Sequence, residues 1–167
     1  MKFVTAKEAI ELIKDNDTIA TSGFVMAQVA EEILTELENK FLETGKPNHL
    51  TVVHAAGQGN GNGGAMDHVA HEGLIKRIVA GHFNLAPKLG ALVNSNAIEA
   101  YNLPQGTISQ WFRAVGGRRP GLITKVGLQT FVDPRLDGGK ISSKSTEDLV
   151  ELMNIDGEEY LRYKQFP

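Results

Sequence analysis

The sequence has no cysteine, no long apolar run and no excess of positive charge. With no cysteine among its 167 residues, it cannot form a disulfide, a thiolate metal site or a thiol nucleophile. No apolar run approaches the roughly 20 residues that a membrane-spanning helix needs, and the charged stretch MKFVTAKEAIELIKDND lacks the apolar core of a signal peptide. The net charge of -3, with no basic stripe, argues against nucleic-acid binding. These absences favour a cytoplasmic protein that binds neither membrane nor nucleic acid.

The stretch VVHAAGQGNGNGGAMDH is rich in glycine, but it lacks other residues that nucleotide-binding loops require. Gly59, Gly61 and Gly64 match the spacing G-x-G-x-x-G of dinucleotide-binding folds. That fingerprint also needs an acidic residue roughly 20 positions on, and the sequence has no Asp or Glu between Glu72 and Glu99. The Lys-Ser/Thr pair of a phosphate-binding P-loop is missing too. We therefore expect neither NAD, FAD nor ATP to bind. The glycines are interpreted as sharp turns, or as room for a ligand or another chain segment.

Two other catalytic patterns are incomplete. His68 and His71 lie between Asp67 and Glu72, as in half of a zinc site, but the second histidine of H-E-x-x-H is missing. We therefore interpret them as histidines on the surface or on a helix face, and we predict no metal. The sequence also has no G-x-S-x-G motif, so it offers no nucleophile typical of serine hydrolases.

Apolar strands alternate with amphipathic helices from the N-terminus to Gly116. The first helix has a capping box, with Thr5 before it and Glu8 three residues later. The second helix ends at Gly45, a typical residue after a helix. This alternation predicts a single α/β domain over residues 1–167, with an open, mainly parallel sheet and flanking helices. The predicted strands are 17–24, 49–56, 76–82 and 98–104, and the predicted helices are 5–17, 27–45, 66–75, 84–96 and 106–116.

The composition changes after the last of these helices. Residues 116–141 are rich in Gly and Pro and predict extended pieces joined by turns. The chain then ends on the apolar residues Tyr160, Leu161, Tyr163 and Phe166 with no polar tail. We expect these side chains to be exposed and to need covering by further polypeptide, because large apolar patches rarely stay bare on a soluble monomer. The domain is therefore interpreted as incomplete, and the isolated chain is expected to self-associate as a symmetric dimer.

Two stretches resemble the family I CoA-transferases, in particular the branch that acts on acetate, propionate and acetoacetate. TSGFVMAQVAEEILTEL is similar to the turn of that family in which a Gly-Phe pair after the first strand leads into a helix. LPQGTISQWFRAVGGRRPGLITKVGLQTFVDPRLDGGK, residues 103–140, resembles the most characteristic part of its N-terminal half. The resemblance covers nearly the whole chain, and it implies the α/β fold that this family shares with sugar-phosphate isomerases.

The resemblance implies a ping-pong transfer of coenzyme A between carboxylic acids. A glutamate attacks an acyl-CoA and then carries the CoA as a glutamyl-CoA thioester, so coenzyme A is a substrate and no cofactor is expected. Each step forms an oxyanion, which preorganised N–H groups stabilise, and Gly23 and Phe24 match the oxyanion turn of the family. The loop Gly57–Gly64 is expected to shape the acyl pocket or the approach to a missing domain. The substrate contacts implied by the resemblance are Val25, Gly59, Gly61, Gln105 and Gln110.

The nucleophilic glutamate of this family is missing from the chain. It belongs to a Ser-Glu-x-Gly motif in the second half of the polypeptide or on a separate subunit. Glu43-Thr44-Gly45 matches only E-x-G, follows Leu42 rather than serine and closes a predicted helix. We therefore expect a truncated N-terminal portion that is inactive alone, that acts on acyl-CoA and short-chain carboxylates with the missing half or subunit, and that forms a homo-oligomer. Two alternatives stay open: a ligand-sensing or sugar-phosphate-isomerase-like α/β domain, and a structural or interaction fragment.

Overall fold

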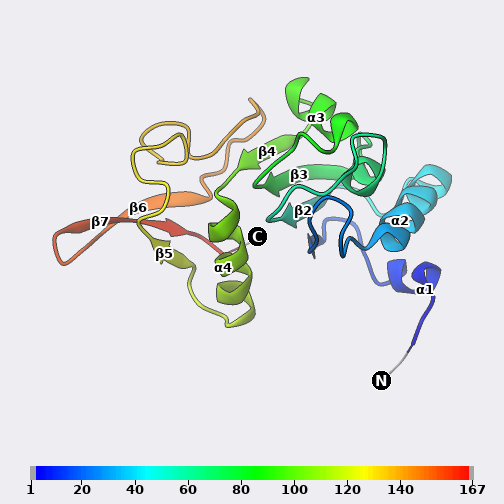
Figure 1. Ribbon diagram of the computed structural model, residues 1–167, viewed down its shortest axis with the longest axis horizontal. Coiled ribbons are helices and arrows are strands. Elements are labelled where there is room, and N and C mark those ends of the chain that lie inside the picture. The colour runs from blue at the N-terminus through cyan, green and yellow to red at the C-terminus, as the bar shows by residue number, and fades with distance from the viewer. Residues whose placement is uncertain (1–2, 166–167) are drawn as a thin grey trace.

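The computed structural model describes residues 3–165, which form two β-sheets with helices packed against the larger one (Figure 1). The larger sheet has four parallel strands in the order β1-β2-β3-β4, and the smaller sheet has three antiparallel strands in the order β5-β7-β6. The elements are α1 (Ala6–Ile10), β1 (Thr18–Thr21), α2 (Glu31–Thr44), β2 (Leu50–His54), the 3-10 helix η1 (Ala65–Val69), β3 (Ile75–Ala80), α3 (Pro87–Asn94), β4 (Glu99–Asn102), α4 (Gln105–Gly116), β5 (Leu122–Thr124), β6 (Val150–Ile155) and β7 (Glu158–Tyr163).

The apolar run around β2 explains the buried, parallel arrangement of the larger sheet. All residues of β2 are buried, as expected for a central strand covered on both faces. β1 and β3 pair with it in parallel, with Ile19 and Ile78 opposite Val52. An α-helix or a 3-10 helix lies in each connection between neighbouring strands and returns the chain to the same edge of the sheet. The predicted α/β class with a mainly parallel sheet is therefore confirmed.

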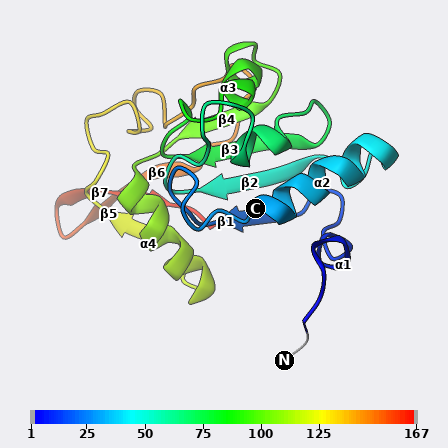
Figure 2. The same ribbon diagram turned by 45° about the vertical axis from the view of Figure 1, so that its right-hand side comes forward.

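The larger sheet lies between two hydrophobic cores, because the side chains of a strand alternate between its faces. Val52 joins the core beneath α2, η1 and α3, which also contains Leu37 and Leu89. Val53 faces the opposite core, beneath α4 and the smaller sheet, which contains Trp111. Figures 1 and 2 show that the two covering layers come from different parts of the chain, the first before β4 and the second after it.

The C-terminal strand β7 is the centre of the smaller sheet, and it buries part of the apolar chain end. Leu161 and Tyr163 are fully buried, whereas Tyr160 is only partly buried. The expectation that the apolar end would be exposed is therefore wrong for Leu161 and Tyr163. The physical reason is that β7 pairs with a strand on each side and turns alternate residues toward Trp111 and its core. The expectation for Phe166 lies outside the described residues.

Two predicted helices begin or end differently from the sequence pattern. The helix predicted over 27–45 starts only at Glu31, because Val25 and Gln28 adopt positive φ angles of 57° and 60° in a turn ahead of it. The helix predicted over 66–75 is the short 3-10 helix η1, which is followed by irregular chain. The first difference lies at the carboxyl edge of the parallel sheet, after β1, whereas the irregular chain after η1 leads to the amino edge, where the Leu50 amide donates to the carbonyl of Leu74.

The predicted helix caps are confirmed. The Thr5 side chain accepts a hydrogen bond from the Glu8 amide, and the Glu8 carboxylate accepts one from the Thr5 amide, which completes the capping box. Gly45 ends α2 in the left-handed conformation with a φ of 68°. α1 itself is shorter than predicted and ends at Ile10. None of the helices formed by residues 3–165 has the length and apolarity needed to cross a membrane.

The segment 116–141 is organised by turns around a buried carboxylate. It contains the end of α4, β5 and a series of turns, as the composition predicts. Asp133 is almost fully buried and accepts hydrogen bonds from the Arg135 guanidinium and from the amides of Gln129 and Arg135. The Arg135 guanidinium, aided by these amides, holds the pKa of Asp133 well below its usual range. The carboxylate therefore stabilises a defined loop in a stretch without helical periodicity.

Candidate active site

The loops that follow β1, β2 and β3 meet at the carboxyl edge of the parallel sheet, which is where open α/β sheets bind ligands. The amide of Val25, after β1, donates to the carbonyl of Gly57 at 2.8 Å, and the Gly59 amide donates to the Val25 carbonyl at 2.9 Å. The Gly61 amide donates to the carbonyl of Leu85, after β3, at 2.9 Å. These bonds bring the predicted site residues Val25, Gly59 and Gly61 into one cluster.

Glycine is required at position 59 by the close approach of the chain to itself. Gly59 has a φ of 154°, and a Cβ atom there would lie 2.0 Å from the carbonyl oxygen of Leu85. A Cβ atom at Gly57 would lie 2.6 Å from Nδ1 of His82. At Gly61, by contrast, no atom of the described residues other than its chain neighbours lies within 4 Å of the Cβ position. The interpretation that glycines make room for another chain segment therefore holds for Gly57 and Gly59.

The predicted oxyanion turn is tight, and one of its amides already has an acceptor. Gly23 has a φ of 133°, which favours glycine. The Phe24 amide donates to the carbonyl of Ala27 at 3.0 Å, and the Ala27 amide donates back to Phe24 at 2.9 Å. The Phe24 side chain is 61% exposed. The Phe24 amide can stabilise an oxyanion only after its bond to Ala27 opens, so the oxyanion role of Gly23 and Phe24 stays a prediction.

The two glutamines of α4 that are predicted to contact the substrate, Gln105 and Gln110, lie on different sides of the helix. Gln105 is the first residue of α4 and lies against Gly81, where a Cβ atom would be 3.1 Å from the Gln105 Cα and 2.3 Å from the Ala55 carbonyl oxygen. It therefore lies beside the ends of β2 and β3. Gln110 is exposed and lies five residues further on, which turns it about 140° around the helix. The structure thus brings Gln105 to the candidate site and directs Gln110 elsewhere.

Three polar residues at this edge, the partly buried Thr21 and the buried Gln58 and His54, were missed by the sequence analysis. Thr21, which ends β1, donates its hydroxyl proton to Oε1 of the buried Gln58 at 3.0 Å, and so ties β1 to the glycine loop. His54, which ends β2, has its Nδ1 atom 2.7 Å from the carbonyl oxygen of Ala56. Burial, together with nearby His82, lowers the pKa of His54 to about 4. The ring is therefore neutral at pH 7, and its Nδ1–H donates to Ala56. The sequence signal that could have found Thr21 and His54 is a polar residue at the end of an apolar strand.

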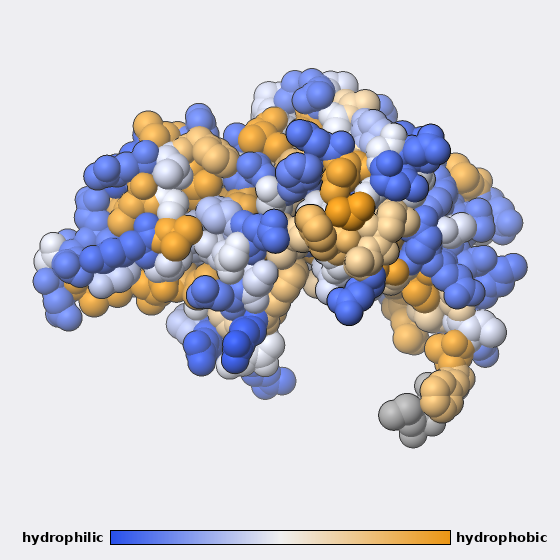
Figure 3. Space-filling model, viewed as in Figure 1, coloured by the Kyte–Doolittle hydropathy of each residue, from blue (hydrophilic) through white to orange (hydrophobic). Residues whose placement is uncertain are grey.

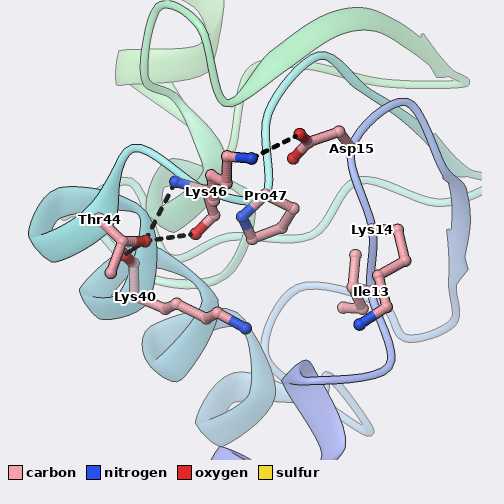
Figure 4. Close-up of a pocket in the computed structure, with 7 residues that line it drawn as sticks. All are labelled: Ile13, Lys14, Asp15, Lys40, Thr44, Lys46 and Pro47. Atoms are coloured by element: carbon pink, nitrogen blue, oxygen red, sulfur yellow. Dashed lines mark hydrogen bonds and ion pairs between the residues drawn. The ribbon is translucent and has the colours of Figure 1, made fainter.

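A separate hollow of about 480 Å³ opens at the opposite, amino edge of the sheet (Figure 4). Its position follows from Asp15 and Pro47, which precede β1 and β2 in the chain. Lys46 pairs with Asp15 at 3.5 Å, and Lys40 pairs with Glu11 at 2.8 Å, so acidic neighbours partly neutralise both ammonium groups. The hollow is therefore not part of the candidate site. It is lined by Ile13, Lys14, Asp15, Lys40, Thr44, Lys46 and Pro47.

Nearly all of the chain matches one protein family. The sequence profile of that family, described as Coenzyme A transferase, matches residues 3–164. The chain belongs to the coenzyme A transferase family. Caffeate CoA-transferase of Acetobacterium woodii is 44% identical over 165 residues, which cover 99% of this chain and 32% of that protein. Acetate CoA-transferase YdiF of Escherichia coli K12 is 36% identical over 162 residues, which cover 96% of this chain and 30% of that protein.

Solved structures of CoA-transferases share the fold of this chain. The acyl-CoA transferase YdiF apoenzyme from Escherichia coli O157:H7 matches with a TM-score of 0.90 and 36% identity, over 98% of this chain and 32% of its own. Glutaconate coenzyme A-transferase from Acidaminococcus fermentans matches with a TM-score of 0.64 at 16% identity, which shows the fold alone. The chain thus spans about a third of the length of its first-named relatives. The predicted family and fold class are confirmed.

His68 in η1 and His71, which follows η1, contact α2 through a partly buried network. His68 Nδ1 lies 2.5 Å from Glu38, and His71 Nε2 lies 2.6 Å from the other oxygen of that carboxylate. His68 Nε2 lies 3.1 Å from Glu31, whose second oxygen accepts a bond from the Ala65 amide. His68 lies on the face of η1 that packs on α2, as the helix-face interpretation allows, and only 16% and 27% of the His68 and His71 side chains are exposed. Within residues 3–165, no group of three or more His, Asp or Glu side chains has the geometry of a metal site.

Asp67, which flanks these histidines, caps helix α3. Its side chain is fully buried, and Oδ1 accepts hydrogen bonds from the amides of Lys88 and Leu89 at 2.9 and 3.1 Å. Ala86, the residue before α3, has no side-chain oxygen that could accept these hydrogen bonds. A carboxylate at a helix N-terminus satisfies free amides and interacts favourably with the helix dipole. Asp67 therefore anchors η1 to the helix that follows β3.

The free energy of unfolding is expected to fall as the pH rises through the pKa of His68. Burial alone would lower this pKa, but hydrogen bonds to Glu38 and Glu31 outweigh burial and raise it. The folded chain therefore holds the proton more tightly than the unfolded chain. The resulting stabilisation is complete below about pH 6.5 and is lost above the raised pKa. Burial alone would raise the pKa of Glu38, but its hydrogen bonds to both histidines outweigh burial and lower this pKa. The stabilisation that Glu38 contributes is therefore lost in acid.

Urea denaturation at pH 6 and pH 8.5 measures this effect. We expect His68 to contribute a loss of about 1 kcal/mol between the two values, as for a charge-assisted hydrogen bond that is weakened. The lowered pKa of His54 acts in the opposite sense, because at pH 6 the unfolded chain protonates His54 and the folded chain does not. From pH 6 to pH 8.5, the free energy of unfolding of His68→Gln should therefore fall less, or rise more, than that of the control. The control His49→Gln changes an exposed histidine and should keep the difference of the unmodified chain. Equal pH dependence in His68→Gln and His49→Gln would show that the network holds no extra proton.

Proposed function

We propose that this chain is the N-terminal portion of a transferase that moves coenzyme A between an acyl-CoA and a short-chain carboxylate. The observation that carries the proposal is the 44% and 36% identity to caffeate and acetate CoA-transferases over nearly the whole chain. Because the chain spans about a third of those proteins, we assign the activity to a longer polypeptide or to a complex with a second subunit. The second arrangement is supported by the alpha subunit of acetoacetyl-CoA:acetate/butyrate CoA transferase of Clostridium acetobutylicum, which is 26% identical.

Side chains at the carboxyl edge suit a small acid with one apolar end. Phe24 is 61% exposed and Val25 is 37% exposed, so both can contact an acyl chain without rearrangement of the core. Gln105 is exposed beside the ends of β2 and β3 and carries a carboxamide that can both donate and accept hydrogen bonds. We assign the acyl chain to Phe24 and Val25, and the carboxylate or thioester oxygen to Gln105.

The transfer would proceed through a glutamyl-CoA thioester. A glutamate from the remaining polypeptide attacks the acyl-CoA carbonyl, forms a mixed anhydride and releases the CoA thiolate. The thiolate attacks the glutamyl carbonyl, expels the first carboxylate and leaves the thioester, and the second carboxylate then takes over the CoA by the reverse steps. Each attack places charge on a carbonyl oxygen, and we assign its stabilisation to the turn at Gly23 and Phe24. The Phe24 amide would exchange its Ala27 acceptor for the oxyanion.

The position of Glu43 supports the proposal that the chain is inactive alone. Glu43 is exposed in the last turn of α2, just before the glycine that ends the helix. Glu31 begins α2 and contacts the Ala65 amide near the glycine loop. Twelve residues of helix separate the two glutamates, which is about 18 Å. Glu43 therefore lies far from the carboxyl edge, where a nucleophile is needed.

An exchange assay between acetyl-CoA and propionate tests this proposal. The purified chain is expected to show no turnover above background, because it lacks the Ser-Glu-x-Gly motif and because Glu31, the glutamate near the glycine loop, is already bonded to His68 and to the Ala65 amide. The intact acetate CoA-transferase of Escherichia coli serves as the positive control. Turnover by the chain alone that disappears in Glu43→Gln would show that Glu43 is a nucleophile and that the assignment of the missing glutamate is wrong.

A further inference from the structure

The far end of the glycine loop is fastened to α2 by the carboxylate of Glu31. Within the loop, the Asn60 side-chain oxygen accepts hydrogen bonds from the amides of Asn62 at 2.8 Å and Gly64 at 3.1 Å. The Ala65 amide, which directly follows the loop, donates to Oε2 of Glu31 at 2.9 Å. Because the bonds to Asn60 join this part of the loop into one unit, Glu31 ties that unit to the first turn of α2.

Ala65 has a backbone conformation that needs support from its neighbours. Its φ is 54°, in the left-handed region that residues with a Cβ atom seldom adopt. Such a conformation persists only where the surrounding structure holds it. Ala65 is also fully buried, so its amide would be left without this acceptor if Glu31 moved away. The end of the loop is therefore sensitive to the position of Glu31.

Glu31 is held in turn by His68, whose imidazole ring contacts two carboxylates of α2. Nε2 lies 3.1 Å from Oε1 of Glu31, and Nδ1 lies 2.5 Å from Glu38, whose other oxygen lies 2.6 Å from Nε2 of His71. Only a protonated ring carries an N–H on both nitrogens, so only the imidazolium donates to both carboxylates at once. Burial lowers the pKa of His68, but the bonds to Glu38 and Glu31 outweigh burial and raise it.

The surroundings of His68 let the pH of the solvent control the ring. The His68 side chain is 16% exposed, and hydrophilic residues dominate the surface over α2, on the right-hand side of Figure 3. α3 also packs near η1, and its one ionisable side chain, Lys88, directs its ammonium group toward Gly63 of the loop. The Asp67 carboxylate accepts bonds from two amides of α3. The charged groups that raise the pKa of His68 are therefore the two carboxylates of α2.

We propose that His68 and Glu31 form a latch that holds the glycine loop in place while His68 is protonated and releases the loop when the proton leaves. A neutral ring keeps one N–H, which stays with the nearer carboxylate, Glu38. The lone pair of Nε2 then faces Oε1 of Glu31, and two acceptors repel each other. Glu31, whose side chain is 40% exposed, turns toward solvent, and the Ala65 amide loses its acceptor.

Thr35 provides the alternative partner that makes two states possible. Its hydroxyl donates to the backbone carbonyl of Glu31 at 2.9 Å and lies 3.4 Å from Nε2 of His68. When the ring is neutral, this hydroxyl can rotate and donate to Nε2, so His68 keeps two partners in both states. A histidine that exchanges partners in this way is a pH-sensitive element. The latch itself is independent of the chemistry, and only its consequence for the acyl pocket rests on the proposed function.

Nuclear magnetic resonance of the isotope-labelled chain tests the latch. As the pH rises, the amide signals of Gly64 and Ala65 are expected to shift with the same midpoint as the ring signals of His68, above about pH 6.5. Between pH 6 and pH 8.5, the hydrogen-exchange protection factor of the Ala65 amide should fall at least about fivefold more than that of Val52. Val52 is the reference because β2 is paired on both sides, so its amide reports only on global opening.

Two substitutions of Glu31 separate the latch from a general loss of packing. The carboxamide of Glu31→Gln can accept from Ala65 and donate to a neutral His68, so Ala65 should stay protected at both pH values and its signal should no longer follow the ring. Glu31→Ala removes the acceptor and should leave Ala65 poorly protected at both. His68→Gln should also remove the pH dependence, whereas the control His49→Gln, at an exposed histidine, should keep it.

The outcomes for the loop and for CoA transfer are independent of each other. An Ala65 amide that does not respond while His68 titrates, or a His68 ring that keeps one protonation state from pH 6 to pH 8.5, overturns the latch. So does a pH dependence of Ala65 that persists in Glu31→Gln or His68→Gln when circular dichroism shows the variant folded. If the latch works as described but no transferase activity is found with any added polypeptide, the proposed function fails and the latch stands.

Discussion

Replacing Gly59 with alanine is expected to lower the free energy of unfolding by about 3 kcal/mol or more. The new Cβ atom would lie 2.0 Å from the carbonyl oxygen of Leu85 and 2.6 Å from its carbonyl carbon, and these backbone atoms cannot rotate away as a side chain could. The φ of 154° adds strain, because residues with a Cβ atom rarely adopt it. Guanidinium denaturation followed by the fluorescence of Trp111, the single tryptophan, measures the loss.

Gly90→Ala is the matched control for this substitution. Gly90 lies inside α3, and apart from its chain neighbours and the backbone of its own helix, no atom of the described residues lies within 4 Å of its Cβ position. Alanine there should raise the free energy of unfolding by about 0.5–1 kcal/mol, because it favours the helix. If Gly59→Ala were as harmless as Gly90→Ala, the glycine loop would not approach Leu85 in solution. The cluster of loops at the candidate site would then need a different arrangement.

Tyr163→Ala is expected to lower the free energy of unfolding by about 3–5 kcal/mol, as for other large aromatic residues removed from a core. The Tyr163 ring is fully buried and packs edge-on against Trp111 with the ring centroids 6.1 Å apart. Its hydroxyl donates a hydrogen bond to the carbonyl of Val126 at 2.9 Å. The substitution thus leaves a cavity between the smaller sheet and α4 and also leaves the Val126 carbonyl without this donor. The loss is measured by guanidinium denaturation followed by circular dichroism.

Two controls separate the contributions to this loss. Tyr163→Phe removes only the hydrogen bond and should cost about 1 kcal/mol. Tyr160→Ala changes the opposite face of β7, where the ring lies near the Lys125 ammonium at 5.1 Å and is partly exposed. It should cost about 1 kcal/mol or less. A larger loss for Tyr160→Ala than for Tyr163→Ala would mean that β7 buries the other face.

The burial of Tyr163 also changes the expectation of self-association. That expectation rested on an exposed apolar chain end, and Leu161 and Tyr163 are instead buried under the smaller sheet. Self-association itself stays a prediction.

The sequence by itself determined the elements whose pattern is local. The apolar run at 50–54 predicts a buried strand, because a strand covered on both faces needs apolar residues at every position. The capping box of Thr5 and Glu8 and the left-handed Gly45 also depend on residues close together in the chain. The same kind of local signal, in the stretch 103–140, placed the chain in its family.

Only the tertiary structure decided how these elements meet. The contacts of Val25 with Gly57, of Gly61 with Leu85 and of His68 with Glu38 join residues that lie far apart in sequence. A side chain carries no local mark of such a partner, since the same residue type serves equally on a solvated surface. The exposed or buried state of a strand face likewise depends on which layer covers it. The sequence therefore predicted the sheet and its family, whereas packing decided the geometry of the candidate site.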